Sequence, residues 1–133
     1  MSYWSRTYEG VPEQLSAVRQ YTRDVLGDGP GVDDVVLVVS ELAANAIRHT
    51  LSGEPDGVFV LHVADFTDYW QVRVDDQGSP KTPGVADPDD SEIAGWGLAV
   101  VGELAEKWDV AGDEYARAIW AVVLKPKPTK ARA

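Results

Sequence analysis

The chain has no cysteine, no long apolar run and comparatively little positive charge. Without cysteine it can have no disulfide framework, no thiolate zinc site and no cysteine nucleophile, which fits a reducing compartment. No stretch approaches the roughly 18 apolar residues of a membrane span. The first ten residues, MSYWSRTYEG, lack the basic region and apolar run of a secretory signal. We therefore expect a cytoplasmic protein that does not contact a membrane.

The charge balance argues against nucleic acid as a direct partner. The sequence has 22 acidic and 12 basic residues, a formal net charge of −10 at pH 7. Four of the basic residues lie near the C-terminus, at Lys125, Lys127, Lys130 and Arg132, so the remainder is still more acidic. Such a body repels the phosphate backbone. On charge alone, a solubilising surface explains the acidity better than a docking face for a basic protein.

The size and composition predict one folded domain. The chain has 133 residues, of which 44% are hydrophobic, and it includes five tryptophans. That is enough apolar material for a core in a domain of ordinary size. We predict a single domain over residues 1–124, followed by a basic, disordered tail over residues 125–133.

Hydrophobic periodicity predicts three helices and five strands. The helices are expected from Pro12 to the glycine-rich stretch at Gly27–Gly31, from Asp33 to Thr50, and over Ile93–Lys107. The strands are expected at Trp4–Tyr8, Val58–Phe66, Tyr69–Val74, Trp108–Val110 and Ala116–Leu124. Asp75–Glu92 is rich in Pro, Gly, Asp and Ser and is expected to be a long loop, of the kind that often serves as a functional lid. Hairpin strands and helices in this order indicate an α/β fold. We expect a two-layer α/β sandwich with a mixed, mostly antiparallel sheet covered on one face by three helices.

Three polar residues share one face of the second predicted helix. Glu41, Asn45 and His49 are spaced i, i+4 and i+8 in a stretch that is otherwise apolar or rich in alanine. A carboxylate and an amide oxygen are hard ligands that suit Mg²⁺. Buried polar groups need partners, because leaving one unsatisfied costs roughly 1–3 kcal/mol. A solvated stripe on an amphipathic helix explains the same spacing, and spacing alone slightly favours that simpler interpretation.

Two further motifs follow along the chain. Asp76 continues the alternation of Val72 and Val74, so its carboxylate should face the buried side of a strand, where it could accept a hydrogen bond from an exocyclic amine. Gly78 would allow a base or a backbone segment to approach closely. A plain turn is the simpler explanation of Asp76-Gln77-Gly78 taken alone.

The third motif, Gly95-Trp96-Gly97-Leu98, precedes the last predicted helix. Backbone N–H groups at a glycine-rich helix N-terminus can hold phosphate oxygens. A glycine-rich hinge explains the motif equally well. It is neither a dinucleotide fingerprint nor a P-loop, because the third glycine of the first motif and the Gly-Lys-Ser/Thr end of the second are absent.

Taken together and in this order, the three motifs resemble the ATP-binding module of the GHKL superfamily, which includes gyrase, Hsp90, histidine kinases and MutL. SELAANAIRHT resembles the N-box of that family, DDQGSP its G1 motif and GWGLAVVGELAEKWDV its G2 motif. The nearest resemblance is to the small anti-sigma-factor serine kinases of actinomycete type. It covers roughly Gly10–Leu124.

The resemblance implies ATP and Mg²⁺ as ligands and assigns a role to each residue. It makes Glu41 the catalytic carboxylate, Asn45 the Mg²⁺ ligand and His49 a supporting residue of the site. It places the adenine amine at Asp76 with Gly78 beside the base, and the phosphates at the backbone of Gly95, Gly97 and Leu98. It further implies transfer of phosphate to a serine of an anti-anti-sigma factor, a sigma factor as a second partner, and a possible homodimer.

Two features depart from the family pattern. Pro80 stands where a second G1 glycine is common. The predicted lid is acidic, and Lys81 alone opposes its four carboxylates at Asp87, Asp89, Asp90 and Glu92. Two alternatives therefore accompany the kinase hypothesis. One is a nucleotide-binding regulatory module with little kinase activity, which the presence of both Glu41 and Asn45 argues against. The other is an interaction domain whose pocket stays empty.

Overall fold

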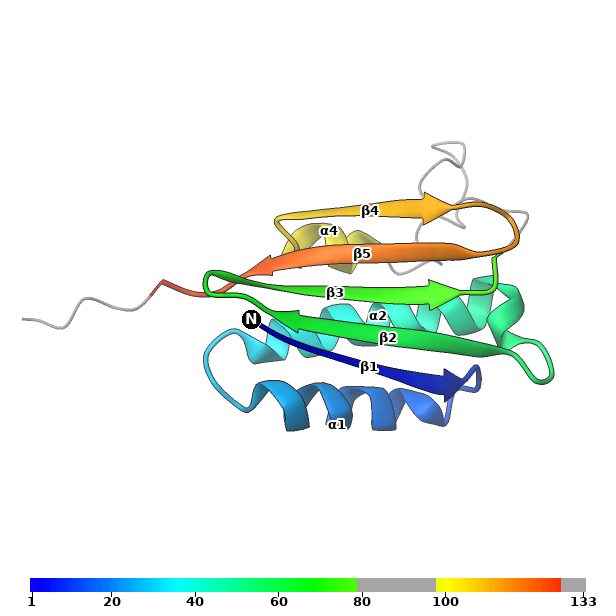
Figure 1. Ribbon diagram of the computed structural model, residues 1–133, viewed down its shortest axis with the longest axis horizontal. Coiled ribbons are helices and arrows are strands. Elements are labelled where there is room, and N and C mark those ends of the chain that lie inside the picture. The colour runs from blue at the N-terminus through cyan, green and yellow to red at the C-terminus, as the bar shows by residue number, and fades with distance from the viewer. Residues whose placement is uncertain (79–97, 128–133) are drawn as a thin grey trace, which may run out of the picture.

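The structure is a computed structural model in which residues 1–78 and 98–127 are described (Figure 1). Its elements follow in the order β1 (Ser2–Glu9), α1 (Gln14–Leu26), α2 (Val32–His49), the 3-10 turn η1 (Leu51–Gly53), β2 (Val58–Asp65), β3 (Tyr69–Asp76), α4 (Leu98–Leu104), β4 (Lys107–Gly112) and β5 (Arg117–Leu124). In the described ranges, no helix is long and apolar enough to cross a membrane.

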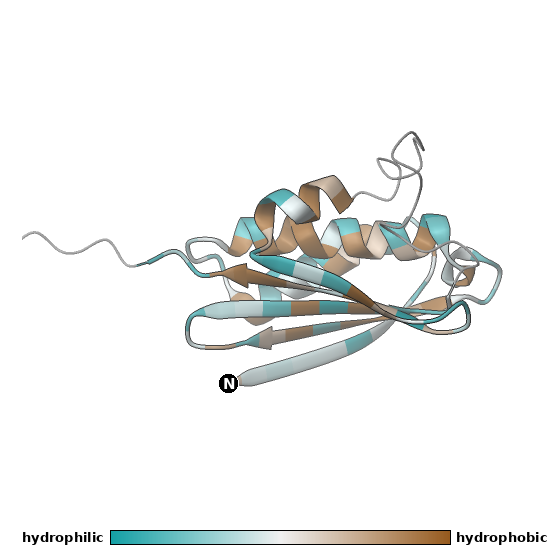
Figure 2. Ribbon diagram, turned by 90° about the horizontal axis from the view of Figure 1, so that it is seen from above, coloured by the Kyte–Doolittle hydropathy of each residue, from teal (hydrophilic) through white to brown (hydrophobic). Residues whose placement is uncertain are grey.

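The strands form one five-stranded sheet in the order β1-β2-β3-β5-β4. The helices lie together on one face of this sheet, and the opposite face carries no helix among the described residues (Figures 1 and 2). The predicted two-layer α/β sandwich is therefore confirmed. Each of the four strand pairings is antiparallel, so the sheet has no parallel pair among its described strands, where a mixed sheet was expected. The strand expected at the N-terminus is β1, which lies at one edge of the sheet.

The core lies between the sheet and the helix layer. Side chains alternate along β2, where Phe59, Leu61 and Val63 are buried, as expected for a sheet with one covered face. Valines dominate the first half of α2, a composition that on propensity alone would permit a strand. They form a helix here because residues such as Val35 and Val38 fall on a helical face that is fully buried.

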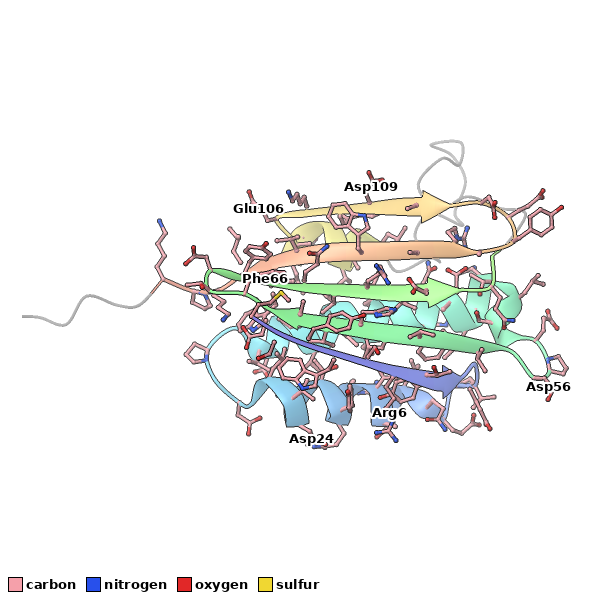
Figure 3. The ribbon with its side chains drawn as sticks, in the orientation of Figure 1. Arg6, Asp24, Asp56, Phe66, Glu106 and Asp109 are labelled. Atoms are coloured by element: carbon pink, nitrogen blue, oxygen red, sulfur yellow. The ribbon has the colours of Figure 1, made fainter. Side chains whose placement is uncertain are left out.

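The first helix packs beside α2 and the edge strand β1. Val18 and Thr22 form its buried side. The side chain of Arg6 on β1 extends beside α1 (Figure 3), and its guanidinium carbon lies 5.6 Å from the ring centre of Tyr8 and 5.5 Å from that of Tyr21. These distances permit cation–π attraction, so Arg6 links the strand to the helix layer.

Two predicted boundaries are corrected. The last helix ends at Leu104, where the periodicity predicted Lys107, because the N–H of Glu106 already donates to the carbonyl of Val122 at 2.8 Å and the chain has entered the sheet. Strand β3 continues through Asp76, so the first two residues of the expected loop are strand residues paired with β5. The remainder of that loop from residue 79, with the predicted helix start at 93–97, lies outside the described residues.

Lys125 follows β5 and contacts the rest of the domain. Its Nζ lies 2.6 Å from a carboxylate oxygen of Asp65 and 5.4 Å from the ring centre of Trp70. Its backbone N–H donates to the carbonyl of Asp68 at 3.0 Å. The domain boundary after Leu124 and the disorder of the tail stay predictions, because residues 128–133 are outside the described ranges.

We predict that Leu42→Ala destabilises the domain by about 2–5 kcal/mol, because Leu42 is fully enclosed between α2 and the sheet and its truncation leaves a cavity. Leu37→Ala on the same helix is the matched control, since Leu37 is 43% exposed, and its cost should be roughly 1 kcal/mol or less. Urea unfolding measures both. Equal costs for the two variants would contradict the described packing of α2.

Candidate functional site

The polar row on α2 has a buried centre and half-buried ends. Asn45 is 1% exposed, although both of its neighbours in the row, Glu41 and His49, are half-buried. A solvated stripe does not describe this row, because its central amide is withdrawn from water. Burying an amide in a valine-rich core is unfavourable unless it is hydrogen-bonded, so the row differs from an ordinary helix surface.

Hydrogen bonds join the end of α2 to the end of β3. The carbonyl of Gly78 accepts a hydrogen bond from the N–H of Leu51 at 2.9 Å. The N–H of Gln77 donates to the hydroxyl oxygen of Ser52, also at 2.9 Å. Ser52 is itself held by the Thr50 hydroxyl, which accepts its N–H at 3.0 Å. The turn after the helix and the segment after the strand therefore form one connected unit.

The polar groups of α2 lie at increasing distances from this junction. His49 is the last residue of α2 and lies next to the junction, Asn45 is one turn back, and Glu41 is two turns back. At 1.5 Å of rise per residue, four residues span roughly 6 Å along the helix. A bound molecule with one end at Asp76 could thus extend along α2 past Asn45 toward Glu41.

Asp76 ends β3 as a buried carboxylate, on the same side of the sheet as Val74, as its alternation predicted. Its Oδ1 accepts the N–H of Gly78 at 2.7 Å. Its Oδ2 lies 3.5 Å from Nε of Arg117, which is directly opposite in the β3–β5 pairing. Burial raises the pKa of Asp76 above its usual value, while the Gly78 N–H and the Arg117 guanidinium oppose that rise. The carboxylate is thus oriented by one backbone N–H donor and by an ion pair with the strand that lies opposite.

Arg117 was not among the residues that the sequence singled out. Its side chain is 3% exposed and that of Asp76 is 1% exposed, so the pair is enclosed by the protein. The signal was present, because Arg117 begins the same alternation that places Ile119 and Ala121 in the core. The pairing of β3 with β5, which sets this arginine against this aspartate, joins segments far apart in the chain.

The backbone at Gly78 requires glycine. Its φ of +82° is in the left-handed region, and an added Cβ would lie 2.1 Å from the carbonyl oxygen of Glu114. Glu114 belongs to the turn between β4 and β5. The close approach expected at Gly78 is therefore made by protein backbone, which ties the end of β3 to the β4–β5 hairpin.

The third motif lies partly outside the described residues. Gly95 and Gly97 are in the segment that is not described. Leu98 begins α4, and its side chain is buried in the core cluster at 5% exposure. Since α4 packs on α2, the start of α4 lies in the same layer as the polar row. Any contact of Leu98 with a ligand would have to come from its backbone.

A magnesium ion could be held here only with help from non-protein ligands. Within residues 1–78 and 98–127, no group of three His, Cys, Asp or Glu side chains is arranged to hold a metal. The oxygens of Asn45 and Glu41 are of the hard type that Mg²⁺ takes, and Mg²⁺ commonly combines one or two protein ligands with phosphate oxygens and water. The donor set therefore fits Mg²⁺ bound together with phosphates.

A cavity of about 340 Å³ reaches Asp76 beside the β4–β5 hairpin. It is lined by Asp75, Asp76, Ala111, Gly112, Ala116, Arg117 and Ala118. No residue of α2 lines it, so it is separate from the polar row. Asp76 and Arg117 are the residues that this cavity shares with the candidate site.

The chain belongs to the family of histidine kinase-like ATPase domains, because the model of that family matches residues 7–122. The matched range takes in the polar row on α2, the end of β3 and both strands of the C-terminal hairpin. The resemblance to the GHKL superfamily is thereby confirmed at the level of the family. No curated protein matches the chain.

Two solved structures share the fold. One contains the RsbU and RsbW domains of Rv1364c from Mycobacterium tuberculosis, with 18% identity and a TM-score of 0.70 over 95% of this chain. The other is the histidine kinase AdeS of Acinetobacter baumannii, with 18% identity and a TM-score of 0.51 over 96% of this chain. The match spans 33% of the first of those proteins and 69% of the second. At this identity the likeness establishes the fold.

We predict that Gly78→Ala destabilises the domain by more than Gly27→Ala. Both glycines have a positive φ, +82° and +83°, a range that L side chains rarely adopt, so each variant should incur some backbone strain. Nothing lies within 4 Å of a Cβ at Gly27, whereas a Cβ at Gly78 meets backbone. Chemical unfolding of the two variants measures the difference. Equal losses would show that the contact with Glu114 is not tight.

Proposed function

We propose that this domain binds ATP with Mg²⁺ between α2 and the end of β3. We further propose that it serves as a serine/threonine kinase for an anti-anti-sigma factor and as an anti-sigma factor. The observation that carries the proposal is the polar row on α2 with its buried Asn45, on a helix whose following turn is hydrogen-bonded to the strand end that holds Asp76. Membership in the ATPase family supports the nucleotide, and the position of the row supports the site.

The order of the polar groups suggests how ATP would lie. The adenine amine would donate to Asp76, whose carboxylate accepts from one backbone N–H and has lone pairs to spare. The phosphates would then follow α2 toward Asn45. Backbone N–H groups of Gly95, Gly97 and Leu98 would complete the phosphate site, as expected at a glycine-rich helix start. His49, next to the junction, would support the end of α2.

In the proposed reaction, Glu41 is the catalytic carboxylate. It would accept the proton of the attacking serine hydroxyl as the serine oxygen bonds to the γ-phosphorus and the bond to the ADP oxygen breaks. Asn45 would hold Mg²⁺, which when bound neutralises charge on the phosphates. Because Glu41 is two turns from the junction, it would lie at the end of the nucleotide away from Asp76, near the γ-phosphate.

The choice of protein substrate rests on one comparison. Of the two solved structures, the one with RsbU and RsbW domains has the higher TM-score to this chain. This agrees with the resemblance of the sequence to anti-sigma-factor kinases. The acidic character of the chain, with a net charge of −10, is compatible with a basic docking surface on a partner. We therefore propose a sigma factor and an anti-anti-sigma factor as the two partners.

MgATP should raise the melting temperature of the domain, because a ligand that binds only the native state stabilises it. The gain is about 2.7 kcal/mol at a concentration one hundred times the dissociation constant. Asn45→Ala should reduce the gain from MgATP more than that from ATP with EDTA, since it removes the proposed metal ligand. Differential scanning fluorimetry of both proteins measures this. No shift of the wild type at millimolar MgATP would refute ATP binding.

Glu41→Gln should still bind MgATP but lose phosphotransfer by roughly a hundredfold or more, the usual contribution of a general base. The assay is transfer from labelled ATP to candidate anti-anti-sigma proteins of the same genome. Glu103→Gln is the matched control, since Glu103 is an exposed carboxylate on α4, and its rate should equal that of the wild type. Wild-type activity in Glu41→Gln would remove Glu41 from the catalytic role.

A further inference from the structure

Two carboxylate–arginine pairs lie at neighbouring positions of the sheet but on opposite faces. Asp75 and Arg73 are partly exposed on the face without helices, with Nε 2.8 Å from Oδ1. Asp76 and Arg117 are enclosed beneath the helix layer, with Nε 3.5 Å from Oδ2. An exposed pair contributes little. A buried pair is generally not favoured for stability over apolar residues of the same volume, so the second pair calls for another explanation.

We propose that Arg117 is a positioning residue for base recognition. By facing Asp76 across the β3–β5 pairing, it keeps that carboxylate oriented and acceptor-only, and so sets a preference for 6-aminopurine over 6-oxopurine nucleotides. This inference rests on the proposed function, because it assumes that Asp76 meets the base. It goes further by assigning the selectivity of the site to a residue on β5 that is not part of the three motifs.

The chemistry depends on the protonation state of Asp76. An ionised carboxylate only accepts hydrogen bonds, which suits the amine of adenine, whereas a protonated carboxyl can donate to a 6-oxo group. Burial favours the protonated form by raising the pKa of Asp76, and the positive charge of Arg117 opposes this. Removing that charge should therefore move protonation of Asp76 toward neutral pH and weaken the preference for the amine.

The surroundings of Asp76 include other groups that could affect its charge. On its own strand these are Asp75 and, facing the side without helices, Arg73. On neighbouring elements they are Arg117 on β5, Glu41, Arg48 and His49 on the second half of α2, and Asp113 and Glu114 in the β4–β5 turn. Asp75 is negative and raises the pKa of Asp76, with a smaller effect than Arg117. Arg117 is the cation directly opposite Asp76 in the strand pairing, which makes it the group to change.

The test compares wild type, Arg117→Gln and Arg117→Lys by calorimetric binding of MgATP and MgITP from about pH 5 to about pH 8. Nearby opposite charge lowers a carboxyl pKa by about one to three units. ATP affinity falls on acidification as Asp76 is protonated, and in Arg117→Gln this fall should begin about one pH unit or more above that of the wild type. Within that pH range, the ratio of ATP affinity to ITP affinity should be about tenfold lower in the variant. Arg117→Lys keeps the positive charge, so its ATP affinity should fall at the same acid pH as that of the wild type.

Arg73→Gln is the matched control. It removes an arginine with an aspartate partner from the same sheet, with the same change in net charge, but on the face away from α2. Its ATP-over-ITP preference and pH profile should match those of the wild type. Circular dichroism and melting temperature confirm that each variant is folded, because removing one partner of a buried pair can cost stability.

The outcomes separate this inference from the proposed function. If the wild type binds no ATP, the proposed function fails. If wild type and variants bind ATP, but Arg117→Gln has the same pH dependence and the same ATP-over-ITP preference as the wild type, the role of Arg117 is refuted and the proposed function stands. If Arg117→Gln does not fold, Arg117→Lys decides the question. A folded lysine variant that binds ATP but lacks the wild-type preference for ATP over ITP would contradict positioning by charge.

Discussion

The hydrogen bonds between the end of α2 and the end of β3 are the constraint on which the candidate site depends. Helix α2 is apolar around most of its circumference, and hydrophobic burial has no direction, so packing alone leaves its position along the sheet weakly defined. The bonds from Leu51 to Gly78 and from Gln77 to Ser52 have defined geometry and partners. They set the position of the helix along the sheet, and therefore the distance of Asn45 and Glu41 from the end of the strand that carries Asp76.

The polar groups at this position are difficult to justify by stability. The other buried residues of α2 are valine, leucine and alanine, so Asn45 is the only buried polar residue of that helix. Asp76 and Arg117 continue two strands that are otherwise apolar on that side. Apolar residues of similar volume would pack there without loss of solvation. The proposed nucleotide would supply the missing reason, because preorganised polar groups bind a ligand without first having to be ordered.

Periodicity predicted the elements well, since it depends on neighbours in the chain. The alternation that buries Phe59 and Val63 and the helical spacing around Asn45 can be read directly from the sequence. The end of the last helix was missed because it is set by Glu106 bonding to Val122, a partner across the sheet. The role of Arg117 was missed for the same reason, since the pairing of β3 with β5 cannot be derived from either strand alone.

Gly78 shows how the fold and the site share one residue. A motif-based interpretation reserves this glycine for the base, yet its positive φ and the nearby carbonyl of Glu114 in the β4–β5 turn already require glycine there. Its N–H holds Oδ1 of Asp76, and the hairpin that it contacts delivers Arg117 to the other carboxylate oxygen. The aspartate is therefore oriented before any nucleotide arrives. A larger residue at position 78 would displace the hairpin and the carboxylate together, which is why the requirement for glycine belongs as much to the fold as to the ligand.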